Sequence, residues 1–315
     1  MAEQKTKALV LFSGGLDSRL VVKLLQEQGI DAECLYFKLP SGCGCSAKEN
    51  EEFAEQNKLK LTIIDCTKGK LFKEYLNIIK KPKFSRGTGM NPCIDCKIFM
   101  FKKAGEYANK QKPKIEIIAT GEVLGERPLS QTSKALAIID KEIGFGLLRP
   151  LSAKLLAETK AEKLGLINRE ALLDIRGRQR KTQLELAKKF NIKYPQPAGG
   201  CLLCEKAYSA KLKDLFKNKE DISEAELETL RAFRHFRSAD THKKIILGKD
   251  YQENVLLEEL NKKLKWNILI PTENPGPTAL FEDKSDKNLV LQLIGAYSSK
   301  NLEERKKFSH LLISF

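Results

Sequence analysis

Short apolar runs alternate with helical periodicity over the first two hundred residues of the chain. The runs are too short for helices and predict strands over 7–12, 32–37, 60–65 and 115–120. Apolar residues spaced three and four apart predict helices over 18–29, 46–57 and 96–110. This alternation is typical of an α/β fold with a doubly wound parallel sheet, which binds ligands at the carboxyl ends of its strands. Further on, the pattern over 137–150 predicts a strand, a turn and a second strand.

The pattern changes after residue 205. Residues 206–230 are charged with helical periodicity, which predicts a connector between domains. Residues 231–315 predict a smaller α+β domain. Its expected elements are strands over 243–247 and 266–270 and helices over 253–264 and 288–297. We therefore expect a large domain over 1–205, the connector, and a C-terminal domain.

The first predicted strand runs directly into Ser13-Gly14-Gly15-Leu16-Asp17-Ser18, and a helical pattern follows. Glycines let the backbone turn tightly and approach a ligand, because they have no Cβ. Free N–H groups at the start of the helix then attract an anion such as a phosphate chain. The Gly-Lys-Ser/Thr ending of a Walker loop is missing. We expect a nucleotide loop of another kind, the alternative being an ordinary glycine turn before a helix.

Basic residues outnumber acidic ones, giving a net charge of +15. This surplus favours a polyanionic partner such as nucleic acid, although a lysine-rich proteome would give the same balance. Two basic clusters, one ending at Arg86 and one over 176–181, are candidate RNA contacts through phosphate. The alternative for both is a solvated charged face. The residues expected to contact RNA are Arg86, Arg176, Arg178, Arg180 and Lys181.

No stretch approaches the roughly 18 consecutive apolar residues of a membrane span, and the N-terminus lacks a signal-peptide core. We therefore expect a cytoplasmic protein with no membrane partner. Thiols stay reduced there, so the eight cysteines should be metal ligands, catalytic groups or buried small residues. Cys34 and Cys66 lie in or beside strand patterns and should be buried and inert. The three histidines, His235, His242 and His310, have no ligand spacing and should lie at the surface or face RNA.

Two cysteine pairs share one spacing, Cys93-x2-Cys96 and Cys201-x2-Cys204. Both follow loops that contain glycine and proline, in which backbone N–H groups can turn toward sulfur and stabilise a thiolate. Four thiolates would also satisfy a structural zinc ion, although more than a hundred residues separate the pairs. Two more cysteines near the expected nucleotide site have no assigned role: Cys43 and Cys45.

These motifs together resemble a known group of enzymes. The loop over 13–18 resembles the PP-loop of the ATP pyrophosphatase superfamily, which has a HUP-like fold. Asn91-Pro92 followed by Cys96 resembles the signature of tRNA 2-thiouridylases, in which that cysteine and a distant second one, here matched by Cys201, transfer sulfur. That signature has aspartate after the proline, whereas this chain has Cys93. The substituted form is similar to iron–sulfur-dependent relatives of tRNA 4-thiouridine synthetase.

The resemblance extends over about residues 6–205, through Thr120-Gly121-Glu122 and the segments 127–131 and 148–151. It implies a tRNA sulfurtransferase that uses ATP and Mg2+ to adenylate a nucleobase carbonyl oxygen and then replaces that oxygen with sulfur. A 4Fe-4S cluster would carry the sulfur, supplied by inorganic sulfide or by a persulfide from a cysteine desulfurase. The implied ATP-binding residues are Ser13, Gly14, Gly15, Leu16, Asp17, Ser18, Phe37, Thr120 and Gly121. The implied cluster ligands are Cys93, Cys96 and Cys201, with Cys204 as a further candidate, and the implied catalytic residues are these three with Asp17.

Two alternatives stay open. In the first, Cys96 or Cys201 carries a persulfide without a cluster, and the other cysteine resolves the product as a disulfide. In the second, the chain is a noncatalytic RNA- or ribosome-binding protein with a structural four-cysteine zinc site.

The C-terminal domain has a resemblance of its own. Residues 245–250, Trp266 and residues 274–279 resemble motifs of the NFACT-R domain. Members of that family are associated with RNA and the ribosome, so the resemblance implies a second RNA-binding surface. The alternative is a domain that only completes the fold or forms a homodimer.

Overall fold

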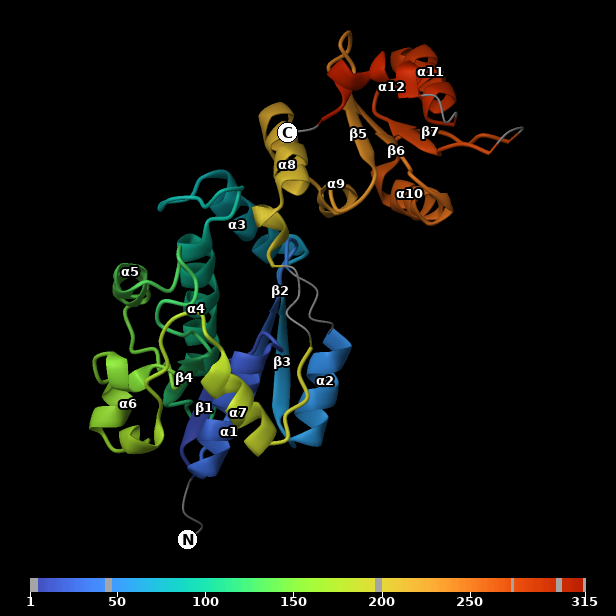
Figure 1. The fold of residues 1–315 in the computed structure, drawn as a ribbon. Helices are drawn as coiled ribbons and strands as arrows, with labels where there is room; N and C mark the ends of the chain where they lie inside the picture. Colours follow the sequence, from blue (N-terminus) through green and yellow to red (C-terminus); the bar gives the residue numbers. More distant parts are fainter. Residues whose placement is uncertain (1–4, 43–46, 196–199, 273–274, 299–301, 314–315) are drawn as a thin grey trace. The chain divides into compact units, whose positions relative to one another are not determined.

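The computed structural model describes residues 5–42, 47–195, 200–272, 275–298 and 302–313 (Figure 1). The chain divides into two compact units, Met1–Cys201 and Leu202–Phe315, and each has a sheet of its own. No helix of the described ranges is both long and apolar enough to cross a membrane.

Four parallel strands form the sheet of the N-terminal unit, in the order β3-β2-β1-β4. They are β1 (Lys7–Leu11), β2 (Asp31–Lys38), β3 (Lys60–Asp65) and β4 (Ile117–Thr120). All four predicted strands are confirmed, with ends shifted by at most two residues. The chain adds β2 and β3 on one side of β1 and then returns to add β4 on the other. This reversal is the switch point of a doubly wound α/β sheet, and ligands of such sheets bind at the carboxyl ends of the two strands that flank it.

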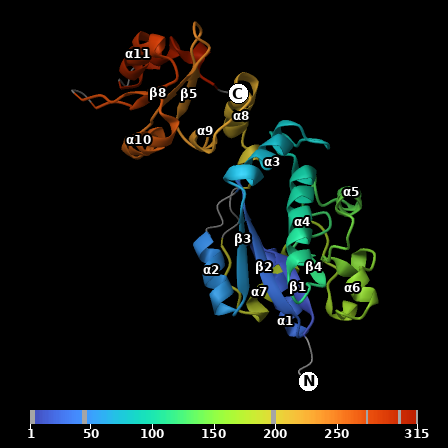
Figure 2. The ribbon, with the colours of Figure 1, turned by 180° about the vertical axis from the view of Figure 1, so that it is seen from behind.

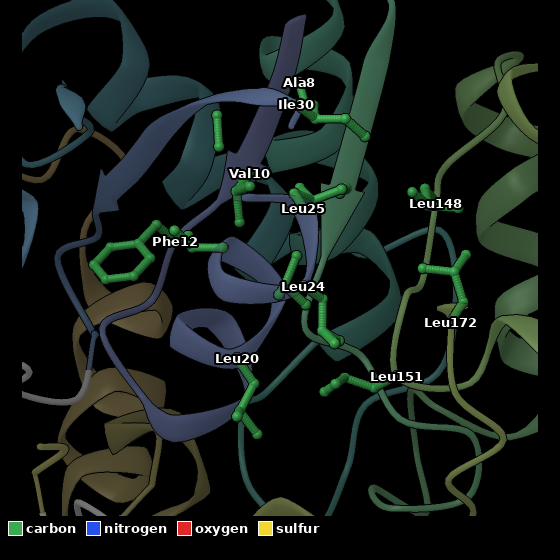
Figure 3. Packing of buried hydrophobic residues seen from close by; sticks show 14 of the residues in the cluster. Ala8, Val10, Phe12, Leu20, Leu24, Leu25, Ile30, Leu148, Leu151 and Leu172 are labelled. Carbon is green, nitrogen blue, oxygen red and sulfur yellow. The ribbon is translucent and has the colours of Figure 1, made fainter. Parts of the chain in front are cut away.

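Helices cover both faces of this sheet (Figures 1 and 2). The helices of this unit are α1 (Leu16–Glu27), α2 (Ala47–Gln56), α3 (Gly69–Lys80), α4 (Cys93–Lys110), α5 (Ser133–Ile143), α6 (Lys160–Lys163) and α7 (Lys181–Lys189). Ala8 and Val10 of β1 pack with α1 and α7 in one core cluster, and Leu9 between them is equally buried on the other face. Figure 3 shows leucines of α1 beside β1 and the segment around Leu148 and Leu151. The strand that leads into the nucleotide loop is therefore held on both faces.

The sequence prediction for residues 137–150 was wrong. This region contributes most of α5, a helix, in place of the first strand, and the second predicted strand is reduced to a single parallel bridge between Leu148 and Ala119 of β4. Thr132 caps the helix by accepting a hydrogen bond from the Ala135 N–H, and Gly144 ends it in a left-handed conformation. The apolar residues, which suggested strands, are spaced for one buried helix face.

The C-terminal unit contains an antiparallel sheet in the order β5-β6-β8-β7. Its strands are β5 (Arg234–Arg237), β6 (Lys244–Leu247), β7 (Asn267–Leu269) and β8 (Ala279–Phe281). Its helices are α8 (Lys206–Asn218), α9 (Glu224–Thr229), α10 (Tyr251–Leu264), α11 (Lys287–Ser298) and α12 (Leu302–Lys306). Ile245 and Leu247 pack with α11, and Ile246 between them packs with α10, so the sheet is buried on both faces. The expected elements of this region are present, and sequence analysis missed β5 and β8.

The prediction that His235 lies at the surface was also wrong. This residue of β5 is 0% exposed, and its Nε2 lies 2.9 Å from the carbonyl oxygen of Thr229. Burial, with Lys244 and Lys211 nearby, holds the pKa of His235 well below its usual value, so the ring is neutral. His242 and His310 are exposed, as expected.

Candidate functional site

The loop between β1 and α1 leaves the start of the helix uncapped. Gly15 is the N-cap residue, and no side chain caps the first turn. Gly14 has a φ of +81°, and a Cβ there would lie 1.9 Å from Oδ1 of Asn50. The hydroxyl of Ser18 donates to the carbonyl oxygen of Gly15 at 2.9 Å and fixes the loop against the helix. The first turn therefore offers N–H donors at the positive end of the helix dipole, which suits a phosphate group.

The end of β4 packs against the same helix start. Gly121 has no room for a side chain, because a Cβ would lie 2.8 Å from the backbone nitrogen of Ser18. Thr120 and Leu16 are buried beside it. Phe37, also buried, lies on β2, which pairs with β1 on the side away from β4. The structure thus gathers the predicted nucleotide residues at the carboxyl ends of neighbouring strands.

Asp17 lies in the first turn of α1 with most of its carboxyl group buried. Burial raises its pKa to about 6 and Glu126 adds to the rise, whereas Arg180, Gln183 and Arg127 oppose it. Its Oδ2 lies 3.7 Å from Nη2 of Arg180, while its buried Oδ1 has no hydrogen-bond partner in the described chain. Mg2+ prefers oxygen ligands such as carboxylates. Asp17 offers an available carboxylate oxygen beside the loop that suits a phosphate group, so this residue fits that cation.

Cys93 and Cys96 lie in the first turn of α4, which also lacks a side-chain cap. Asn91 donates from Nδ2 to Sγ of Cys93 at 3.2 Å. Burial raises the pKa of the Cys96 thiol to about 11, although the hydroxyl of Tyr75 acts in the opposite direction. The asparagine of the predicted signature therefore has a definite task here, which is to bond the neighbouring thiol.

Tyr75 of α3 lies between the first cysteine pair and Cys201. Its hydroxyl is 3.6 Å from Sγ of Cys96 and 3.2 Å from Oγ of Ser41. Sγ of Cys201 lies 3.6 Å from the carbonyl oxygen of Ser41. Burial and then the charges of Cys96 and Cys201 raise the pKa of Tyr75 well above its usual value. The three predicted sulfur residues thus lie in one region, while Cys204 is exposed and belongs to the C-terminal unit. Sequence reasoning missed Tyr75 because it precedes the signature by many residues and belongs to no motif.

The donor chemistry of this region suits an iron–sulfur cluster, since its three candidate ligands are all thiols. As positioned, the described residues include no group of three or more His, Cys, Asp or Glu that could hold a metal ion. Cys43 and Cys45 lie outside the described residues. Cys34 and Cys66 are buried, as expected, and burial raises the pKa of each to about 12.

A buried ion-pair network joins the nucleotide loop to the cysteine helix. Glu122, next to the glycine that ends β4, is 2.5 Å from Nζ of Lys97 and 2.9 Å from Nε of Arg149. Arg149 also makes two hydrogen bonds to Asp140 of α5, at 2.8 and 3.0 Å. Burial alone would raise the pKa of Glu122, but Lys97 and Arg149 hold it below its usual value. Because Lys97 directly follows the second cysteine of α4, this network fixes the cysteines relative to the loop.

The predicted RNA contacts separate into two groups. Arg176, Arg178 and Lys181 are exposed. Arg86 is exposed too, and its guanidinium donates to two carbonyl oxygens at the end of α3, at 2.8 and 2.9 Å. Arg180 instead pairs with two carboxylates at the nucleotide loop, those of Glu126 and Asp17.

A cavity of about 430 Å³ lies elsewhere in the N-terminal unit, at the amino half of β4. Ile117, Phe145 and Leu164 are among its lining residues. None of the predicted site residues lines it, so it is separate from the nucleotide loop and the cysteines.

Known proteins resemble about half of this chain. A family model described as thiamine biosynthesis protein (ThiI) matches residues 3–162, just over half of the chain. A probable tRNA sulfurtransferase of Finegoldia magna is 30% identical over 148 residues, which are 47% of this chain and 36% of that protein. The tRNA-specific 2-thiouridylase MnmA of Campylobacter curvus is 28% identical over 167 residues, covering 49% of this chain and 48% of that protein.

Among solved structures, one titled as a 4-thiouridine synthetase–RNA complex with bound ATP has 17% identity and a TM-score of 0.40. The match covers 88% of this chain and 55% of that one. The chain spans about a third of the length of the curated sulfurtransferases that it matches.

Proposed function

Because the chain belongs to the thiamine biosynthesis protein (ThiI) family, we propose that it is an ATP-dependent tRNA sulfurtransferase. One observation carries the proposal: an uncapped phosphate loop and a set of cysteines belong to the same unit and are joined by the buried pair of Glu122 and Lys97. The names of the curated relatives supply the substrate class, since both kinds are named for modification of tRNA.

In the proposed first step, a nucleobase carbonyl oxygen attacks the α-phosphorus of ATP and the bond to pyrophosphate breaks. The first-turn N–H groups of α1 and the hydroxyls of Ser13 and Ser18 orient the phosphate oxygens. Asp17 would hold Mg2+, which neutralises phosphate charge when bound. Arg180 is close enough to this carboxylate to contribute positive charge on the same side.

In the second step, sulfur adds to the adenylated carbon and AMP leaves with the former carbonyl oxygen. Cys93, Cys96 and Cys201 would hold a 4Fe-4S cluster, which supplies an iron site for sulfide when bound. Asn91 and Tyr75 orient two of the thiols through their hydrogen bonds.

The contact between Cys96 and Tyr75, which connects to Cys201 through Ser41, also supports a route without a cluster. A persulfide on one cysteine would attack the adenylated carbon and expel AMP. The thiolate of the other cysteine would then attack the protein-bound sulfur, break the S–S bond and release the thiolated base. This leaves a protein disulfide, and a dithiol reductant must reduce it.

For RNA, we propose that the exposed Arg86, Arg176, Arg178 and Lys181 contact phosphate groups of tRNA. Arg180 would contribute positive charge both at the nucleotide loop and to tRNA binding. Residues 231–315 would form the NFACT-R-like second RNA-binding region, with 206–230 preceding it and 1–205 carrying the chemistry.

ATP–pyrophosphate exchange with tRNA, combined with mass spectrometry of tRNA nucleosides from a deletion strain, tests the proposal. Wild-type protein should catalyse the exchange, and the strain should lack one thiolated nucleoside. Asp17→Ala should abolish exchange. Absence of exchange with every tRNA, together with unchanged nucleosides, would refute the enzymatic function and favour the noncatalytic RNA-binding alternative.

Anaerobic iron analysis separates the two sulfur routes. With a cluster, Cys93→Ala, Cys96→Ala and Cys201→Ala should each remove iron and thiolation, while Cys204→Ala should be milder. Cys34→Ala is the matched control, because this cysteine is buried in a strand of the same unit. Activity that survives only Cys93→Ala would favour the persulfide route, and one zinc per chain without iron would exclude the cluster.

A further inference from the structure

Two buried amides beside the nucleotide loop have hydrogen-bonding capacity that the described chain does not fill. Asn50 of α2 is 0% exposed, and neither its Oδ1 nor its Nδ2 has a partner in the described chain. Gln183 of α7 is likewise 0% exposed, and neither atom of its amide makes a hydrogen bond of ordinary geometry. The two residues come from different helices and from distant parts of the sequence.

Both amides face the loop itself. Asn50 occupies the space that a side chain on Gly14 would need, because its Oδ1 lies 1.9 Å from the position of that Cβ. Gln183 lowers the pKa of the Asp17 carboxyl group through a side-chain hydrogen bond, which uses only part of the capacity of its amide. Oδ1 of Asp17 is itself buried and without a partner. Hydrogen-bonding capacity is therefore left unused on both sides of the first turn of α1.

Such capacity is costly to leave unused. A buried polar group without a partner costs about 1–3 kcal/mol, and native proteins leave few of them. Several gather here, around a helix start that also lacks a cap. A phosphate group that binds at this point would accept hydrogen bonds from the amide nitrogens of Asn50 and Gln183.

We propose that Asn50 and Gln183 are nucleotide-binding residues, whose amides contact the phosphate chain of ATP in the loaded site. This inference rests on the proposed function and adds two residues, from α2 and α7, to the loop and to the end of β4. Contacts with ATP supply hydrogen bonds that the two amides lack in the free protein.

Near-isosteric apolar variants test this proposal. Asn50→Leu and Gln183→Met remove the amides and keep most of the side-chain volume. Without ATP, each variant should be at least as stable as wild type, because an unsatisfied buried group is gone. Its affinity for ATP should fall about tenfold or more, the value of a hydrogen bond to a charged group. Equilibrium dialysis with labelled ATP and thermal unfolding with and without ATP measure both quantities.

Gln28→Met is the matched control. Nε2 of Gln28 is also buried without a partner, but this residue lies at the other end of α1, where its Oε1 accepts a hydrogen bond from the Asn168 N–H at 2.8 Å. This variant should lose some stability and keep its affinity for ATP. The charged variants Asn50→Asp and Gln183→Glu should bind ATP more weakly than the apolar ones, because a carboxylate would face phosphate, and they serve if an apolar variant does not fold.

The outcomes distinguish this inference from the function on which it rests. If the wild-type protein does not bind ATP, the proposed function fails. If it does, and the Asn50 and Gln183 variants bind ATP as tightly as wild type, the inference alone is overturned. Lower stability without ATP, in proportion to the lost affinity, would also overturn it, because the amides would then be structural supports.

Discussion

The two units of this protein treat buried charge in opposite ways. In the N-terminal unit, the buried carboxylate of Glu122 is matched by Lys97 and Arg149. In the C-terminal unit, the excess is cationic: Lys244 is 2% exposed, and burial lowers its pKa to about 8 even though Asp214 lies 3.4 Å away. Burial also lowers the pKa of Lys211 to about 8. One unit pairs its buried charges, and the other holds buried lysines whose protons are more easily lost.

The buried groups that stay neutral also differ between the two units. Burial raises the pKa of the Cys34 and Cys66 thiols in the N-terminal unit, and it lowers the pKa of the His235 imidazole in the C-terminal unit. All three stay uncharged at neutral pH. The difference matters for function, because the charged network of the N-terminal unit links the helix that carries Cys93 and Cys96 to the end of β4, which packs against the nucleotide loop.

The largest effect should come from breaking the matched network. Glu122→Gln leaves the mostly buried Lys97 without a carboxylate and the buried Arg149 with Asp140 alone, and arginine cannot lose its proton. Unfolding free energy should fall by about 3–5 kcal/mol, as for other broken buried pairs. Chemical denaturation measures the change. Asp31→Asn, which removes an exposed pair with Lys7, is the control and should cost less than about 1 kcal/mol. Equal losses in the two variants would contradict the distinction.

A smaller loss should follow when the carboxylate of the cationic unit is removed. Asp214→Asn leaves Arg237 and Lys244 without the carboxylate that they share and should cost about 2–3 kcal/mol at pH 7. Lys244 can escape by losing its proton, so the cost should shrink at pH 9, above its folded pKa of about 8. Fluorescence of Trp266, the only tryptophan of the chain and part of this unit, follows the transition. A loss independent of pH would mean that Lys244 keeps its charge.

Sequence patterns predicted the sheet and the positions of the loop and of Cys93 and Cys96, because these depend on local periodicity and on contiguous motifs. They failed for residues 137–150, where Thr132 and Gly144 were the helix-capping signals that would have identified α5. Long-range contacts left no signal at all. Glu122 and Arg149 pair only in the folded structure, and nothing in the sequence around either residue indicates the other.

The same reasoning explains the histidine error and the new residues at the loop. His235 belongs to a four-residue strand, which is too short for alternation to separate buried from exposed positions. Asn50 and Gln183 lie among charged residues on helices whose sequence resembles that of an exposed face. Only tertiary packing shows that they are buried.

Stability should depend on pH in opposite directions in the two units. Between about pH 8 and 10.5, unfolded Lys211 and Lys244 bind protons that the folded unit has lost, so the C-terminal unit should become more stable as the pH rises. Above pH 9, unfolded Cys34 and Cys66 lose protons that the folded unit keeps, so the N-terminal unit should become less stable. Trp266 fluorescence reports the stability of the C-terminal unit, and hydrogen exchange of α1 reports the stability of the N-terminal unit. Parallel trends in both would contradict the comparison.

The smallest effect concerns a neutral partner in the N-terminal unit, the hydroxyl of Tyr75. Tyr75→Phe keeps the ring, which packs beside Phe99, and removes the bonds to Ser41 and Cys96. Because no charge is left unpaired, unfolding free energy should fall by only about 1 kcal/mol. Tyr251→Phe, at a residue that is 80% exposed in the C-terminal unit, should change nothing measurable. A loss for Tyr75→Phe as large as that for Glu122→Gln would show that the thiol region depends on this hydroxyl as strongly as the network depends on its carboxylate.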